Sequence, residues 1–317
     1  MKLPAYLYKY LKFDILTLES LCGASSYYSD PRKFNDPLDC NPTLEKGVKV
    51  EELESLCQSM LDSKYRQTKS FDELSESTAD KEIAELKYMA TEVDRDDYYL
   101  RLLGSRVKKL LADELSPSGV LSLAERWGCP LMWGHYSAGH TGICLEFEVA
   151  GRYCPSLSCV RYSHGARIKA KDLIEWRLKG SDEAKQRVLK SYFFAKSSDW
   201  AYEREWRDVR PVSGAHSMPF RIQSVYFGFA CETWARACLV KLLSGSPCEP
   251  CSYYEIIRKY RGSVLGRRRL GESEIQEMKL TAVRSSPNWD FDTVSELDLS
   301  SARLHSTHNS TSGTLDR

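Results

Sequence analysis

The sequence predicts an α+β fold: a mixed, mostly antiparallel sheet that carries a helical insertion at about residues 50–116. Ile143, Leu145 and Phe147 fall on one face of an extended segment, and this period of two is typical of a half-buried strand. Between residues 50 and 115 the apolar residues instead recur at helical spacing. Strand-like patterns resume after residue 119, so the helical block is interpreted as an insertion between two parts of the sheet.

The first forty residues combine a strand, a helix and a polar loop. An aromatic strand is expected over residues 6–10 and a short helix over residues 15–21. In the loop that follows, Asn35, Asp36 and Pro37 form a turn signal, because a residue before proline is pushed out of the helical region. The loop is either a plain connection with an Asx turn or one wall of a pocket, and the sequence leaves both open.

A dense stretch of aromatic and polar residues, Pro130–Glu148, lies near the centre of the chain. It places Trp133, His135, Tyr136 and His140 within eight residues and then runs into the strand described above. Its glycines favour a loop, and a loop supported by a strand is a common place for a functional site. We therefore interpret this stretch as one wall of a pocket.

The second half of the chain alternates helices and strands. Helices are expected over residues 171–196, 232–243 and 251–261, strands over 221–229 and within 262–283, and an extended segment over 196–210. From residue 285 the chain is rich in Ser, Thr and Asp without periodicity, which predicts a mostly disordered tail, 285–317. His305 and His308 lie in this tail and are poor catalytic candidates. The expected organisation is a single domain over residues 1–284, followed by the tail.

Composition and charge exclude several classes of protein. The chain has 317 residues, a formal net charge of +1, 42% hydrophobic and 28% charged residues, as in an ordinary water-soluble protein. No apolar run approaches the ~18 residues of a membrane span. Lys9 and Lys12 interrupt the apolar N-terminus, where a secretory signal needs continuity. The balanced charge gives no overall attraction to nucleic acid or membrane, so we expect a cytoplasmic protein without a membrane partner.

Cysteine and histidine patterns do not predict a metal site. The 11 cysteines have no regular spacing and, without an export signal, are expected to be mainly reduced thiols. Cys248 and Cys251 form one C-x-x-C, but no second pair completes a four-ligand zinc site. His135 and His140 have no carboxylate cluster beside them in the sequence, so we assign no metal ligand to this pair.

Two glutamates in the segment 196–210 carry the candidate chemistry. If Glu203 and Glu205 line one pocket, their mutual repulsion raises one pKa and suits general acid–base catalysis. The alternative is a surface ladder in which the neighbouring arginines neutralise both carboxylates. The pair is surrounded by aromatic side chains that would exclude water and so favour the pocket: Trp200, Tyr202 and Trp206.

Four segments share their order and rough spacing with a known family: Leu7–Tyr10, Phe34–Cys40, Leu131–Ser137 with His140, and Trp200–Arg207. Shorter matches lie at Glu146–Phe147, Val160–Tyr162 and Lys196. Together they resemble the bacterial domain of unknown function number 2971, a family that is similar to abortive-infection proteins of phage defence. The resemblance extends over about residues 5–285. The chain departs from the family at Leu11, where relatives carry a basic residue, so Lys9 or Lys12 would have to take that place.

The layout of these segments also resembles that of ADP-ribosyltransferases, and Glu203-Arg204-Glu205 has the E-x-E form of one branch of that class. This resemblance implies NAD as a co-substrate, with no permanently bound cofactor, and a protein or nucleic acid as acceptor. Glu205 would be the catalytic glutamate that stabilises an oxocarbenium-like state, and Glu203 would position the acceptor. Tyr136 or His135 would pack on the nicotinamide.

The expected site draws on all four segments. Beside the two glutamates, the expected substrate-binding residues are Tyr8, Lys9, Asn35, Asp36, Trp133, His135, Tyr136, His140 and Arg207. The hypothesis makes a geometric requirement. Glu203 or Glu205 has to lie within hydrogen-bonding reach, directly or through one water, of a pocket built from the other segments. Four residues are expected to line that pocket: Tyr8, Asn35, His135 and Tyr136.

Two other functions stay open. A binding module would use the same pocket to recognise a phage component or a small ligand without turnover, with the helical insertion as its partner surface. A metal-dependent nuclease or hydrolase would need acidic ligands, for which Asp36, Asp39 and Glu205 are available. The sequence assigns no oligomeric state.

Overall fold

The computed structural model describes residues 3–68, 78–91, 97–151, 154–250, 252–259 and 264–280. The chain divides into two compact units, residues 1–270 and residues 271–317. In the second unit the described part is essentially one short helix, α9 (Glu272–Lys279). The tail expected to be disordered, 285–317, lies outside the described residues, and so does Cys251.

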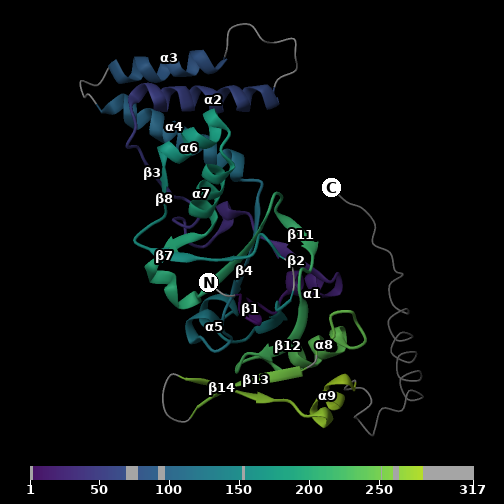
Figure 1. Cartoon of the computed structure of the whole chain (residues 1–317). Coiled ribbons are helices and arrows are strands. Elements are labelled where there is room, and N and C mark those ends of the chain that lie inside the picture. Colours follow the sequence, from purple (N-terminus) through teal and green to yellow (C-terminus); the bar gives the residue numbers. More distant parts are fainter. Residues whose placement is uncertain are drawn as a thin grey trace, which may run out of the picture. The chain divides into compact units, whose positions relative to one another are not determined.

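An eight-stranded sheet forms the centre of the first unit (Figure 1). Its strands follow in the spatial order β14-β13-β12-β5-β1-β4-β10-β6. Their bounds are β1 (Tyr6–Leu11), β4 (Gly119–Ala124), β5 (Ile143–Glu148), β6 (Ser158–Cys159), β10 (Glu205–Arg210), β12 (Arg221–Phe227), β13 (Ser252–Arg258) and β14 (Leu265–Arg269). Neighbouring strands are antiparallel except β12 and β13, which are parallel. The predicted α+β fold with a mixed, mostly antiparallel sheet is therefore confirmed.

Three small two-stranded sheets surround the large one. β2 (Ser25–Tyr28) pairs antiparallel with β11 (Gly214–Ser217). β3 (Thr43–Glu45) pairs parallel with β8 (Arg167–Lys169), and β7 (Arg161–Ser163) with β9 (Ala195–Ser197). Each pair joins an early segment to one at least thirty residues later, so the small sheets fix the loops that lead to and from the large sheet.

Five helices build a separate apolar core (Figure 1). Three of them, α2 (Val50–Thr68), α3 (Thr78–Thr91) and α4 (Tyr98–Leu115), lie in the segment expected to be a helical insertion. They pack together with α6 (Ala170–Lys179) and α7 (Asp182–Phe193). The buried residues recur three or four positions apart, as the helical period requires: Leu53, Leu56 and Met60 on α2, and Leu103, Val107 and Leu110 on α4. No helix among the described residues is both long and apolar enough to span a membrane.

The stretch expected to be a loop contains a short helix, α5 (Pro130–Tyr136). Pro130 occupies the first turn, where a missing N–H and a fixed φ suit a helix start. The glycines act only after the helix, where Gly139 adopts a φ of +66°. Gly142 packs so tightly against the Leu11 carbonyl that a Cβ would clash with it. The turn therefore holds α5 against the end of β1.

α5 covers one face of the sheet with an aromatic core. Trp133 is fully buried there and donates from Nε1 to the Trp127 carbonyl at 2.7 Å. Its ring meets that of Tyr10 edge to face, with 5.3 Å between centroids. Two further helices, α1 (Ile15–Cys22) and α8 (Thr233–Leu243), contact each other, and two 3₁₀ turns, η1 (Pro31–Lys33) and η3 (Ser198–Glu203), complete the unit.

The strand expected to be half-buried, β5, is buried on both faces. It lies between β1 and β12, and Cys144 and Leu145 on its opposite faces are both buried. Glu146 is buried as well, because its carboxylate accepts hydrogen bonds from Ser224 (2.9 Å) and Tyr226 (2.7 Å). The polar residue Glu146 therefore does not indicate that this face of the strand is exposed to solvent. Buried polar groups are tolerated when they are hydrogen-bonded.

The helix expected over residues 251–261 is wrong, because this segment contains the strand β13. Tyr253 and Ile256 are both buried and are three positions apart in the sequence, a spacing that is also found on one face of a helix. Aromatic and β-branched residues also favour strands, and β12 offers a parallel partner over four residue pairs. Tertiary pairing therefore decides the conformation here.

The aromatic core under α5 predicts unequal effects of two tryptophan substitutions. Trp133→Ala leaves a cavity and an unpaired carbonyl, and we expect a loss of about 3–5 kcal/mol in the free energy of unfolding. Trp234 is 66% exposed, so Trp234→Ala is the matched control, with an expected loss below about 1 kcal/mol. Urea denaturation of both variants checks this, and similar losses would contradict the described packing.

Candidate active site

A pocket opens where the sheet splits. β1 and β4, both fully described, share one residue pair, Tyr8 with Ala124, whereas β1 pairs with β5 along its whole length. Further along β4 the partner is Ser29, which bridges to Val120. The separation of β1 from β4 leaves a pocket of about 530 Å³ that residues of both strands line. This volume lies within the range of small-molecule sites.

Most of the residues expected from the sequence converge on this pocket. Its lining contains Tyr8, Lys9, Asn35, His135, Tyr136, Glu203, Glu205 and Arg207. The geometric requirement set above is met, because the Tyr136 hydroxyl donates to Glu203 Oε1 at 2.6 Å. Both glutamates line the same pocket as the four residues named for it.

Three expected residues lie elsewhere. Asp36 is absent from the pocket lining and caps its own turn, accepting from the Leu38 N–H at 2.9 Å. Trp133 belongs to the aromatic core beneath α5. His140 stacks on Trp133 and on Phe229, with ring centroids 6.2 and 4.3 Å away. These three residues therefore support the pocket from outside its lining.

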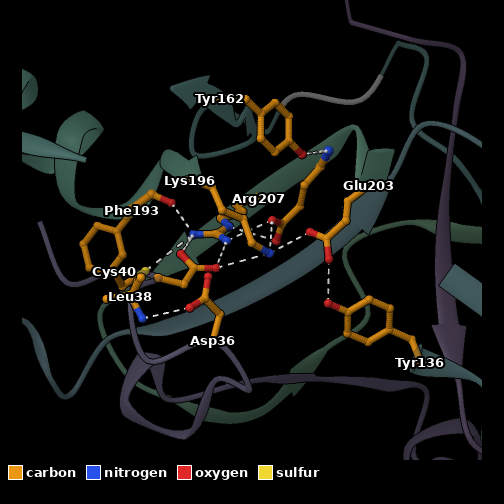
Figure 2. A network of polar contacts seen from close by, with 11 residues as sticks. Asp36, Leu38, Cys40, Tyr136, Tyr162, Phe193, Lys196, Glu203 and Arg207 are labelled. Carbon is orange, nitrogen blue, oxygen red and sulfur yellow. Dashed lines mark hydrogen bonds and ion pairs between the residues drawn. The ribbon is translucent and has the colours of Figure 1, made fainter. Parts of the chain in front are cut away.

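Arg207 is the centre of the site (Figure 2). Its fully buried guanidinium pairs with both oxygens of Asp39, at 2.9 and 2.5 Å, and with both oxygens of Glu205, at 2.9 and 2.8 Å. It also donates to the Phe193 carbonyl at 2.8 Å. Glu205 and Arg207 share a face of β10 because they are two residues apart in a strand. The planar fork of arginine suits these bidentate contacts.

Lys196 is the second cation of the cluster. Its ammonium group lies 2.6 Å from Glu203 Oε2 and 3.4 Å from both Asp39 Oδ2 and Glu205 Oε2. Burial alone would lower the pKa of Lys196, but the three carboxylates outweigh it and raise that pKa. Lys196 therefore stays protonated and ties Glu203 to the pair formed by Arg207.

The two glutamates have opposite electrostatic environments. Burial opposes ionisation of Glu205, yet Arg207 and Lys196 outweigh it and lower the pKa of Glu205 to about 2. For Glu203, burial and the neighbouring charge of Glu205 raise the pKa above its ordinary value of 4.5, although Lys196 acts in the opposite direction. One carboxyl of the E-x-E segment is thus held ionised, while the other favours a proton more than usual.

A backbone kink aims both glutamates at the same lysine. Glu203 ends η3 and Glu205 begins β10, and Arg204 between them adopts a left-handed conformation with φ +45°. That conformation is unfavourable for a residue with a Cβ, by about 1–2 kcal/mol. The Glu205 N–H is fixed by a hydrogen bond to the Tyr162 hydroxyl at 2.7 Å. The surrounding contacts therefore hold the kink in place.

Charge counting identifies the group that can exchange a proton. The cluster holds three carboxyls, on Asp39, Glu203 and Glu205, and two cations, on Lys196 and Arg207, all buried. Full ionisation of these five groups leaves one negative charge in excess, which is costly in a buried site unless the neighbouring Lys9, whose charged form burial disfavours, is protonated. A proton on Glu203 removes that charge, which agrees with its raised pKa.

Lys9 provides a third basic group beside the cluster. Its Nζ donates to the Ser122 carbonyl at 3.0 Å. Burial lowers the pKa of Lys9 to about 8, although Glu205 opposes the shift. Lys9 is therefore a basic pocket residue whose titration lies close to the physiological range. Its position on β1 places it opposite the ionised Glu205 across the split between β1 and β4.

Two carboxylates of the pocket, Asp39 and Glu205, are already paired with a cation. Among the described residues no group of three or more His, Cys, Asp or Glu side chains is arranged to hold a metal ion. Asp39 and Glu205 are already paired with Arg207, and Asp36 is turned to its own backbone. A metal ion here would compete with two built-in cations.

The segment from α5 to β10 matches a family. Residues 132–207 match the model of the family described as Protein of unknown function (DUF2971), which confirms the resemblance over this segment. The segment supplies Tyr136, Lys196, Glu203, Glu205 and Arg207, and β1 and Asp39 complete the pocket from outside it. We found no similar protein among curated proteins and no similar solved structure.

Sequence reasoning overlooked two members of the cluster. Asp39 was considered only as a metal ligand, and Lys196 was not assigned a role. Asp39 lies in Phe34–Cys40, and Lys196 is itself one of the matches to the family, so the resemblance pointed to both residues without giving either a role in the cluster. Both residues act through tertiary contacts with Arg207 and Glu203, and those contacts follow from the fold and not from local spacing.

The buried pairing predicts a large effect of removing the central cation. Arg207→Met leaves Asp39 and Glu205 buried without their partner, so we expect the free energy of unfolding to fall by about 3–5 kcal/mol at pH 7. Arg187 makes two contacts of the same kind, with Asp172 and Glu175, on the surface. Arg187→Met is expected to leave the urea midpoint nearly unchanged. An equally small effect of Arg207→Met would contradict a structural role for the cluster.

Proposed function

We propose that the pocket is the active site of an ADP-ribosyltransferase-like enzyme that uses NAD as co-substrate and acts in phage defence. One observation carries the proposal: the buried carboxyls of Glu203 and Glu205 line the same pocket, and their pKa values are shifted in opposite directions. An acid–base pair typically consists of two titratable groups whose environments shift their pKa values apart. The likeness of the motif layout to ADP-ribosyltransferases supports the choice of reaction by analogy.

The ionised glutamate fits the charge that develops in such a transfer. Cleavage of the nicotinamide–ribose bond leaves its electron pair on neutral nicotinamide and positive charge on the ribose. Glu205, held ionised by Arg207 and Lys196, supplies negative charge beside that oxocarbenium-like centre. Because Arg207 fixes both of its oxygens, Glu205 acts through its field and position and does not act as a proton carrier.

Glu203 fits the role of proton acceptor. Its raised pKa brings it closer to the operating range of a general base than a free carboxylate. The acceptor's oxygen or nitrogen forms the bond to the ribose carbon as its bond to hydrogen breaks, and the ionised form of Glu203 takes the proton. Tyr136, whose hydroxyl bonds Glu203 at 2.6 Å, keeps that carboxyl oriented.

An aromatic group beside the carboxyls offers a place for a planar ring. His135 lies within 6.2–6.4 Å of the rings of Tyr136, Trp200 and Tyr202, measured between centroids. His135 and Tyr136 both line the pocket. Stacking of nicotinamide in this group would place its glycosidic bond near Glu203 and Glu205.

A non-catalytic binding module is the second candidate. The observation in its favour is that all four Glu205 and Asp39 oxygens already accept hydrogen bonds from Arg207. A site saturated in this way is stable without any reaction. Such a module would recognise a phage component or a small ligand in the same pocket, and ligand would raise its melting temperature without forming product.

NAD turnover separates the two candidates. Protein incubated with NAD labelled in the nicotinamide, with cell lysate as acceptor source, is expected to release free nicotinamide. Glu203→Gln and Glu205→Gln are each expected to reduce the rate by about 10²-fold or more, because one loses the base and the other the fixed negative charge. Glu85 is exposed on α3, and Glu85→Gln serves as the matched control with an unchanged rate.

The same experiment has a clear negative outcome. Equal and minimal nicotinamide release by the wild type and by both pocket variants would rule out the enzyme. A melting shift with NAD or another ligand, without product, would then favour the binding module.

A further inference from the structure

The hairpin of β13 and β14 concentrates positive charge at one edge of the sheet (Figure 1). Its described residues carry five basic side chains that are all exposed: Arg258, Lys259, Arg267, Arg268 and Arg269. They carry a single carboxylate, Glu255, which pairs with Arg268 and with Arg236 of α8. The chain as a whole has a formal net charge of only +1, so this edge is a local exception that the overall balance conceals.

Two arginines of this edge, Arg267 and Arg258, lie over aromatic rings. The guanidinium carbon of Arg267 lies 4.8 Å from the Tyr254 ring centroid and 5.2 Å from that of Trp127. Arg258 lies 4.1 Å from the ring centroid of Phe229. These distances are within the range of cation–π contacts. Each guanidinium plane is therefore held on a flat apolar support while its own side chain remains exposed.

The same aromatic group reaches the candidate active site. Tyr226 stacks between Trp127 and Tyr254, at centroid distances of 5.7 and 4.9 Å. On its other side Tyr226 meets Tyr8 edge to face at 6.1 Å, and Tyr8 lines the pocket. One continuous series of aromatic contacts therefore runs across one face of the sheet, from Arg267 at the edge to the pocket between β1 and β4.

Protection of the sheet edge does not account for this arrangement. Charged residues on an edge strand do prevent pairing between copies, but that role needs only charge and not the alignment of guanidinium groups over rings. Binding to an acidic protein surface would likewise need only positive charge, without guanidinium groups placed over rings. Guanidinium and aromatic faces together suit unpaired bases, which stack, joined by phosphates, which need cations.

We propose that the β13–β14 hairpin binds single-stranded nucleic acid. Phosphates of the strand pair with Arg269 and Lys259, and a base stacks on the Arg267 guanidinium beside Trp127 and Tyr254. This binding surface does not depend on the proposed NAD chemistry, because the hairpin residues are separate from the carboxyl cluster.

Fluorescence anisotropy tests the surface with the full chain. The probes are an end-labelled 20-nucleotide single-stranded RNA and the matching DNA, titrated at several salt concentrations. The double variant Arg267→Gln/Arg269→Gln is expected to raise the Kd at least about tenfold. It is also expected to make the slope of log K against log salt shallower by about 0.7, because Arg269 is the phosphate contact that this variant loses. The control Lys171→Gln/Lys179→Gln removes two exposed charges from α6 and is expected to change the Kd less than about twofold.

A conservative variant separates stacking from charge. Arg267→Lys keeps the positive charge and loses the planar group, so its Kd is expected to rise by about threefold or more. Unchanged melting temperatures of all variants show that they remain folded. Wild-type protein that fails to bind either oligonucleotide, or an equal loss in the α6 control, would overturn the proposal. Displacement of the oligonucleotide by polyglutamate at equal charge concentration would also overturn it and point to an acidic protein partner.

Discussion

The structure depends on one buried guanidinium. Arg207 cannot lose its charge, so the fold has to supply anions around it. Asp39 arrives from the loop after η1, Glu205 from the start of β10, and the Phe193 carbonyl from the end of α7. Asp39 is 168 residues from Arg207 in the sequence, whereas Phe193 and Glu205 are 14 and 2 residues away. The arginine therefore joins the helical core, the early loop and the sheet at a single point.

The need to balance the buried charge of Arg207 also determines which groups of the pocket are ionised. Two cations and three carboxyls leave one negative charge in excess within the cluster, and Glu203 is the carboxyl that Arg207 does not contact. The split between β1 and β4 opens a cavity beside this group, with Lys9 and Tyr8 on the opposite strand. A structural ion-pair network and a candidate acid–base pair are therefore parts of one cluster, and the pocket gives both access to a ligand.

The sequence predicted what depends on period and motif. Helical spacing located α2 and α4, alternation located β5, and the motif segments correctly brought Tyr8, Asn35, Tyr136 and the two glutamates to one pocket. It failed where tertiary contacts decide. β13 has a helix-like spacing of buried residues, and α5 is a single short helix next to glycines. The unlike environments of Glu203 and Glu205 arise from Lys196, Asp39 and the kink at Arg204, and no local pattern encodes them.

The central claim is that Glu203 and Glu205, two residues apart, hold protons with opposite tendencies. Side-chain carboxyl ¹³C shifts followed by NMR against pH measure this directly, with Glu203→Gln and Glu205→Gln used for assignment. We predict that Glu203 titrates above 4.5 and that Glu205 stays ionised until the pH approaches about 2 or the protein unfolds. Titration of both carboxyls together near 4.5, or in the reverse order, would contradict the account.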